Sequence, residues 1–185
     1  MYGLIHNSLR AMVKTELGND AWAEIVEAAG LSEKDFLSLK SYDDSVVLAL
    51  LAATHKTTGR SVNDLLYDFG RHFIKHTAFG HYSAVMSMHG SSVWELLDSL
   101  NHMHDRIASS FPDYAPPSFQ LLGSGDGSYE LTYSSTRQGL TSFVRGLIAG
   151  LADHFSVVID INVLEDACSD QGQITRFSLK AIEPT

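Results

Sequence analysis

The chain has 185 residues, of which 44% are hydrophobic and 19% are charged, as in globular domains and unlike disordered chains. Its net charge of −9 argues against non-specific nucleic-acid binding, because neutralising phosphates requires a basic surface. Cys168 is the only cysteine, which excludes an internal disulfide and a cysteine-rich zinc site. No signal peptide is evident and no apolar run approaches about 18 residues, so we expect a cytoplasmic protein without membrane insertion.

The first two thirds of the chain are expected to be helical, because apolar residues recur there at helical spacing. A Gly-Asn-Asp sequence at residues 18–20 ends one predicted helix and caps the next, which stops at Gly30. Ser61 and Ser92 each precede an acidic residue by three positions, a pattern typical of a helix start. The predicted helices cover residues 4–17, the stretch from 20 to Gly30, 45–53, a stretch from about 62, and 92–109.

Beyond residue 110 the pattern changes to strands. Prolines at 112, 116 and 117 disfavour helix, and the chain is expected to become extended there. We predict strands over residues 118–122, 129–137, 157–163 and 174–182, with a helix over 139–154 and a polar turn before the last strand. This order indicates an α+β fold, in which an N-terminal helical part precedes a C-terminal part with a four-stranded antiparallel sheet and helices.

A row of hydrogen-bond donors lies at the end of the second predicted strand. Side chains alternate between the two faces of a strand, so Tyr133, Ser135 and Arg137 are expected to share one face. The guanidinium fork of arginine binds carboxylates through two parallel hydrogen bonds. The row therefore suits a ligand with carboxylates, although these residue types are also common in sheets without any function.

His104 stands out among the nine histidines because it falls on the apolar stripe of the helix over 92–109, between Leu100 and Ile107. His102 is about 200° away around the helix axis, so we expect His104 to be the most buried histidine. One interpretation is a core histidine bonded to a backbone carbonyl. The other is a ligand of haem iron, which needs only one protein nitrogen and whose two propionates would match the row of donors.

These residues together resemble the haem nitric oxide/oxygen-binding (H-NOX) domain, whose fold is shared with the haem domain of soluble guanylate cyclase. The Tyr-x-Ser-x-Arg motif of this family, which holds the haem propionates, is intact at Tyr133, Ser135 and Arg137. Residues 100–107 resemble its proximal-histidine helix, with His104 as the iron ligand. Residues 111–119 resemble its proline segment, where Pro116 or Pro117 would press on the haem. Residues 1–5, 42–44 and 139–140 fit as well.

The resemblance implies a single haem domain over residues 1–185. It would consist of a distal helical subdomain over about 1–60 and a haem-binding subdomain over about 61–185, with haem b (iron protoporphyrin IX) buried between them. The resemblance also implies further residues at the haem or in the distal pocket: Ile5, Leu9, Phe73, Thr77, Leu100, Ser142, Phe143 and Leu147.

The expected gas preference follows from the residues on the distal side of the haem, where the gas would bind. Oxygen-binding members of the family carry a tyrosine five residues past the arginine of the motif, and this chain has Ser142 there. No tyrosine or tryptophan occurs among the implied pocket residues, so we expect binding of nitric oxide and carbon monoxide without a stable oxygen complex. An oxygen sensor of the same fold is the alternative. A haem-free interaction domain or a small hydrolase is also considered, but the Gly-x-Ser-x-Gly elbow of hydrolases is absent.

The resemblance also implies how a signal would leave the domain. The chain ends shortly after the last predicted strand, so we expect a stand-alone sensor of the bacterial type without catalytic activity. Its partner would be a separate protein, commonly a histidine kinase or a cyclic-di-GMP enzyme in this family. Nitric oxide weakens the iron–histidine bond in the family, and loss of that bond would free the helix that carries His104.

Overall fold

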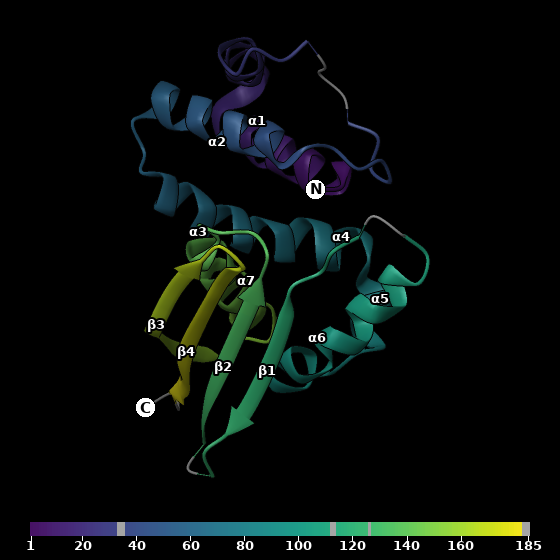
Figure 1. The fold of residues 1–185 in the computed structure, drawn as a ribbon, viewed down its shortest axis with the longest axis vertical. Helices are drawn as coiled ribbons and strands as arrows, with labels where there is room; N and C mark the ends of the chain where they lie inside the picture. The colour runs from purple at the N-terminus through teal and green to yellow at the C-terminus, as the bar shows by residue number, and fades with distance from the viewer. Residues whose placement is uncertain (33–35, 112–113, 126, 183–185) are drawn as a thin grey trace.

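The computed structural model describes residues 1–32, 36–111, 114–125 and 127–182, so Pro112 and Asp113 of the predicted proline segment lie outside it. Helices fill the first two thirds and a sheet with one helix follows, as predicted (Figure 1). The helices are α1 (Gly3–Ala28), α2 (Asp44–Thr58), α3 (Val62–His72), the π-helix η1 (Phe73–Ala78), α4 (Phe79–His81), α5 (Ser83–Ser87), α6 (Val93–Ala108) and α7 (Thr141–His154). The strands are β1 (Ser118–Gly123), β2 (Ser128–Ser135), β3 (Val158–Ser169) and β4 (Gly172–Ile182).

Several helix boundaries follow directly from the sequence. The hydroxyl oxygen of Ser61 accepts a hydrogen bond from the Asp64 backbone N–H at 3.1 Å, and Ser92 accepts one from Glu95 at 3.2 Å, which confirms both predicted N-caps. The first two predicted helices are joined in α1 across a kink at Gly18, whose φ of 91° only glycine adopts at little cost. No helix among the described residues is long and apolar enough to cross a membrane.

The sheet is antiparallel with the order β1-β2-β4-β3, which confirms the predicted α+β class. The prediction was wrong about residues 164–169, which continue β3 and do not form a turn. The register shifts between Val163 and Glu165, and this bulge interrupts the alternation that would have revealed the strand. Strand β3 is therefore 12 residues long. It lies at one edge of the sheet.

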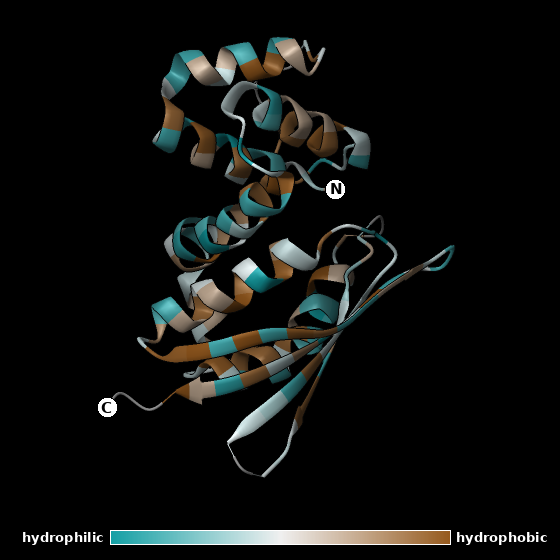
Figure 2. Cartoon of the chain, turned by 90° about the vertical axis from the view of Figure 1, so that its left-hand side faces the viewer, coloured by the Kyte–Doolittle hydropathy of each residue, from teal (hydrophilic) through white to brown (hydrophobic). Residues whose placement is uncertain are grey.

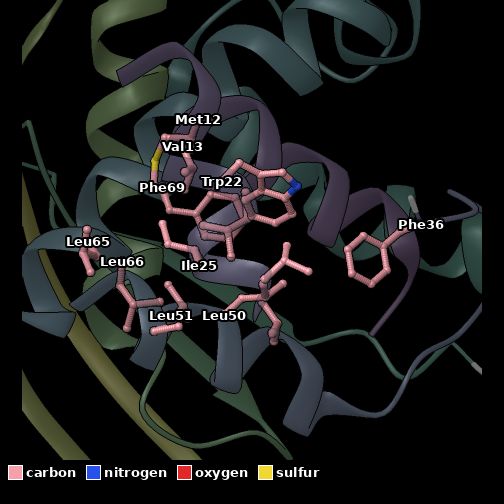
Figure 3. Packing of buried hydrophobic residues seen from close by; sticks show 14 residues of the cluster. Met12, Val13, Trp22, Ile25, Phe36, Leu50, Leu51, Leu65, Leu66 and Phe69 are labelled. Atoms are coloured by element: carbon pink, nitrogen blue, oxygen red, sulfur yellow. The ribbon is translucent and has the colours of Figure 1, made fainter. Parts of the chain in front are cut away.

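The helices and the sheet form two packed regions. In Figure 1, α1 and α2 lie together at one end of the molecule, the sheet lies at the other, and α3 crosses between them. Trp22, Ile25 and Phe69 belong to a first hydrophobic cluster, shown in Figure 3, that joins α1, α2 and α3. A second cluster lies between the sheet and the helices α6 and α7, and contains Leu131, Phe177 and Ile148. The outer face of the sheet is more polar, and Figure 2 shows hydrophilic and hydrophobic residues alternating along the strands.

The two regions are joined where α3 crosses α7. A Cβ atom on Gly146 would lie 3.1 Å from the Gly70 Cα and only 2.9 Å from the Tyr67 carbonyl carbon. A Cβ atom on Gly70 would lie 2.7 Å from the Leu147 nitrogen. The two helix backbones therefore touch, and glycine is required on both sides of the contact.

Candidate functional site

A cavity of about 450 Å³ lies between α1, α2, α3, α7 and the sheet, which is a size usual for small-molecule and cofactor sites. The side contributed by α1, α3 and α7 is entirely apolar among the described lining residues. Those residues are Leu4, Ile5, Val62, Leu66, Phe69, Phe143, Val144 and Leu147. Leu140, the residue directly before α7, also lines the cavity. The residues of the proline segment and the sheet that also line it are Tyr114, Ala115, Pro117, Phe119 and Tyr133.

Tyr133, Ser135 and Arg137 all line this cavity, so the structure brings the predicted row of donors together. Strand β2 ends at Ser135, however, and Arg137 lies beyond it, which corrects the predicted strand over 129–137. The Ser135 hydroxyl oxygen accepts a hydrogen bond from the Arg137 backbone N–H at 3.0 Å, and this turn keeps the guanidinium on the cavity side. Burial raises the pKa of the Tyr133 phenol, which therefore stays protonated as a donor.

The guanidinium of Arg137 already has partners within the chain. Its Nε donates to Asp44 Oδ2 at 2.7 Å and its Nη1 donates to the Ala115 carbonyl at 3.0 Å. The other oxygen of Asp44 accepts from the Met1 ammonium at 2.6 Å. Burial opposes ionisation of Asp44, but the Met1 ammonium and Arg137 outweigh it and lower its pKa. No spacing in the sequence indicates this link, because Asp44 and Arg137 lie 93 positions apart.

His104 is not itself a lining residue of the cavity, but it contacts Pro117, which is one. Its Nδ1 is 3.3 Å from the Pro117 carbonyl oxygen, and its ring centroid is 5.9 Å from that of Phe119 and 6.1 Å from that of Tyr114. Burial lowers the pKa of His104 and favours the neutral imidazole, the form that ligates metals. A histidine whose Nδ1 is held by a carbonyl keeps Nε2 available as a ligand.

The prediction that His104 is the most buried histidine was wrong. His104 is half-buried, whereas His6 on α1 is 0% exposed. The His6 ring stacks on Phe36 with centroids 4.7 Å apart and also contacts Tyr42. Both aromatic partners come from the segment after α1, so helical periodicity alone could not identify this contact. His102, about 200° away around the axis of α6, is exposed and so lies in a different environment from His104.

The helix that carries His104 is tied to the proline segment by a second residue. The Asn101 side-chain amide donates from Nδ2 to the Phe119 carbonyl at 2.6 Å, and its Oδ1 accepts from the Phe119 backbone N–H at 2.9 Å. These two bonds fix α6 against the start of β1. Asn101 was missed in the sequence because an asparagine inside a helix more often faces solvent.

The other predicted pocket residues divide into two groups. Ile5, Phe143, Leu147 and Pro117 line the cavity, whereas the remaining predicted residues do not: Leu9, Phe73, Thr77, Leu100, Pro116 and Ser142. Thr77 instead donates its hydroxyl to Ser8 at 2.8 Å, and Leu9 is buried in the first cluster. Two tyrosines that were not predicted line the cavity, Tyr2 and Tyr114, with ring centroids 5.9 Å apart.

Comparison with known proteins identifies the family to which the chain belongs. A family model described as Haem-NO-binding matches residues 2–163. Soluble guanylate cyclase gcy-31 from Caenorhabditis elegans is 26% identical over 186 residues, covering 99% of this chain and 26% of that protein. Guanylate cyclase soluble subunit beta-2 from Rattus norvegicus is 30% identical over 98 residues, covering 52% of this chain and 14% of that protein. The chain thus spans about a quarter or less of these relatives.

Solved structures support the same fold. A structure that concerns the molecular mechanism of H-NOX activation has a TM-score of 0.88 at 22% identity, covering 100% of this chain and 98% of that chain. An Fe(II) unliganded H-NOX mutant from K. algicida has a TM-score of 0.84 at 24% identity, covering 99% of this chain and 97% of that chain.

Proposed function

This chain belongs to the haem-NO-binding family, and on that premise we propose that it binds haem in the cavity and senses a diatomic gas. The observation that carries the proposal is the cavity itself, which combines an apolar interior with Tyr133, Ser135 and Arg137 at one end. Members of this family are sensor domains without catalytic activity of their own, so we regard this stretch of chain as a binding module and not as an enzyme.

The residues present fit a haem. The apolar side of the cavity suits the porphyrin, and the donors of Tyr133, Ser135 and Arg137 suit its two carboxylates. His104 would hold the iron through Nε2 while the Pro117 carbonyl orients its ring through Nδ1. A bound haem supplies an iron that takes up the gas. The sequence lacks the Cys-x-x-Cys-His pattern of covalent haem attachment, which supports non-covalent haem b.

The apolar side of the cavity supports a preference for nitric oxide and carbon monoxide. Bound oxygen carries partial negative charge and gains from a hydrogen-bond donor, which nitric oxide does not need. The described lining residues of α1, α3 and α7 offer no side-chain donor, and Ser142 does not line the cavity. Tyr2 and Tyr114 favour the second candidate, an oxygen sensor, because their hydroxyls could serve as donors if they reach the gas.

The signal would leave through α6. Asn101 and His104 both bond the backbone of the segment from Pro117 to Phe119, so a displacement of His104 would act on the contact between α6 and β1. The curated relatives are soluble guanylate cyclases, and a cyclase, a histidine kinase or a cyclic-di-GMP enzyme is the proposed receiver. We also propose the division into a distal part over 1–60 and a haem-binding part over 61–185, with α3 packing against both.

The absorption spectrum of the purified protein tests haem binding. We expect a Soret band that is lost in His104→Ala and restored by added imidazole, which replaces the missing ligand. His102→Ala is the matched control, since His102 lies on the exposed side of the same helix, and its spectrum should equal that of the wild type. A folded protein that shows no Soret band after reconstitution with haem would refute the proposal.

Exposure of the ferrous protein to air tests the gas preference. We expect no long-lived oxygen complex in the wild type, and binding of both nitric oxide and carbon monoxide. Phe143→Tyr adds a hydroxyl to a lining residue and should prolong the oxygen complex, whereas Phe155→Tyr, outside the cavity, should not. A stable oxygen complex in the wild type that is lost in Tyr2→Phe or Tyr114→Phe would favour the oxygen sensor.

A further inference from the structure

The connection from the Tyr-x-Ser-x-Arg motif to α7 is short, and its residues Gln138, Gly139 and Leu140 line the cavity. Only three residues separate Arg137 from Thr141, the first residue of α7. The residue before the helix, Leu140, provides no side-chain cap. Both ends of this connection reach the cavity, since Arg137 lies at its polar end and Phe143 on its apolar side. What fixes this connection therefore also fixes two parts of the proposed haem site.

The end of the β3–β4 hairpin instead holds the start of α7 through hydrogen bonds to the hydroxyl of Thr141, the first residue of the helix. The Thr141 hydroxyl donates from Oγ1 to Asp166 Oδ2 at 2.8 Å, and Thr141 Oγ1 in turn accepts a hydrogen bond from Gln173 Nε2 at 2.6 Å. The other oxygen of Asp166 accepts from Gln173 at 2.7 Å and from Thr175 at 3.0 Å. Gln173 and Thr175 are 2% and 0% exposed, whereas Asp166 is exposed, so the bonds made by Gln173 and Thr175 are the better shielded from water and the more costly to break.

The same hairpin end also contacts the connection itself. The Leu140 backbone N–H donates to Gln173 Oε1 at 3.2 Å, and Gln138 Nε2 donates to the Ser169 carbonyl at 2.7 Å. Gly172 has a φ of 128°, and a Cβ atom there would lie 2.9 Å from the Thr136 Cα. The hairpin turn is therefore pressed against the chain just before Arg137, at a position where only glycine fits.

We infer that Thr141, Asp166 and Gln173 are positioning residues for the haem and gas site, because their hydrogen bonds fix the start of α7 relative to the Tyr-x-Ser-x-Arg motif. This inference rests on the proposed function. Asp166, Gln173 and Thr175 lie beyond residues 2–163, the part matched by the family model. The carboxylate also lies near the N-terminus of α7, where the helix dipole favours a negative charge.

Thr141→Val tests the inference, because it keeps the shape of the side chain and removes the shared hydroxyl, while Thr141→Ser keeps the hydroxyl. Without haem, amide hydrogen exchange at Val144, whose N–H donates to the Leu140 carbonyl at the start of α7, should become about tenfold faster in Thr141→Val, as for the loss of a partly buried hydrogen bond. In the haem-loaded protein, haem transfer to an acceptor should become about tenfold faster, and the Fe–CO stretching frequency should shift. Thr141→Ser should restore all three values. Thr132→Val, on the opposite face of β2 from Tyr133, is the control and should change none.

The outcomes separate the two proposals. Unchanged exchange at Val144 in Thr141→Val would overturn the role of the hydroxyl, whatever the haem does. Faster exchange with unchanged haem transfer and Fe–CO frequency would overturn its role at the haem site. A wild type without any Soret band after reconstitution would overturn the proposed function, and with it the haem part of the inference, while the exchange data would still decide whether the hairpin positions α7.

Discussion

Replacing Gly146 by alanine should destabilise the protein at the crossing of α3 and α7. The new Cβ would lie 2.9 Å from the Tyr67 carbonyl carbon and 3.1 Å from the Gly70 Cα, and closer still to the Tyr67 oxygen. Carbon atoms pack at about 3.5 Å or more, so the two helix backbones must move apart. Overpacking of this kind costs about 1–3 kcal/mol, although alanine gains up to about 1 kcal/mol in helix propensity.

Urea unfolding measures this cost, with Gly80→Ala as the matched control. A Cβ on Gly80 would meet only the Lys75 carbonyl, at an ordinary 3.6 Å, so the control keeps the propensity gain without the clash. We expect Gly146→Ala to unfold with about 2 kcal/mol less free energy than Gly80→Ala, and to melt about 4–8 °C lower. Equal stability of the two variants would refute the inference that the helix backbones touch.

Three further predictions concern the site. Asn101→Ala removes two hydrogen bonds to the Phe119 backbone and should lower the free energy of unfolding by about 1–3 kcal/mol in a urea titration; no loss would mean that α6 is held elsewhere. Arg137→Ala should accelerate haem transfer to an acceptor, whereas Arg176→Ala, on the outer face of the sheet, should not. The pKa of Asp44 is lowered below its ordinary value of 3.8, so its contribution to stability is present above that pH and is lost as the pH falls through the folded pKa. Asp44→Asn should reduce this acid dependence, by less than about 1 kcal/mol because the ion pairs are partly exposed; an unchanged pH profile would contradict the link.

Local patterns predicted the fold well where they act within a few residues. The caps at Ser61 and Ser92 and the antiparallel strands follow from side chains that bond nearby backbone or alternate along the chain. The same reasoning ended strand β3 too early, at residue 163, because the residue inserted at the Leu164 bulge reverses the alternation of faces. Residues 73–87, which contain η1, α4 and α5, were not divided into these separate elements by the prediction, which gave one helix from about residue 62 without an end.

The site was predictable only in part, for a related reason. Tyr133, Ser135 and Arg137 are neighbours in sequence, so their common surface could be anticipated. Asp44 reaches Arg137 from α2, and Asp166 reaches Thr141 from β3, and both contacts depend on how separate elements pack. Periodicity within one element contains no information about such pairs, which is why the partners of the motif had to come from the structure.

The edge strand β3 has a consequence for the behaviour of the protein at high concentration. A strand of 12 residues that pairs on one side only could template sheet formation with a second copy. The bulge at Leu164 interrupts its pairing edge, and the carboxylates of Asp160, Glu165 and Asp166 give this strand a negative charge that would repel a second copy. Colloidal stability therefore depends on ionised carboxylates along this edge. Acidification, which neutralises them, leaves the bulge as the remaining barrier to aggregation.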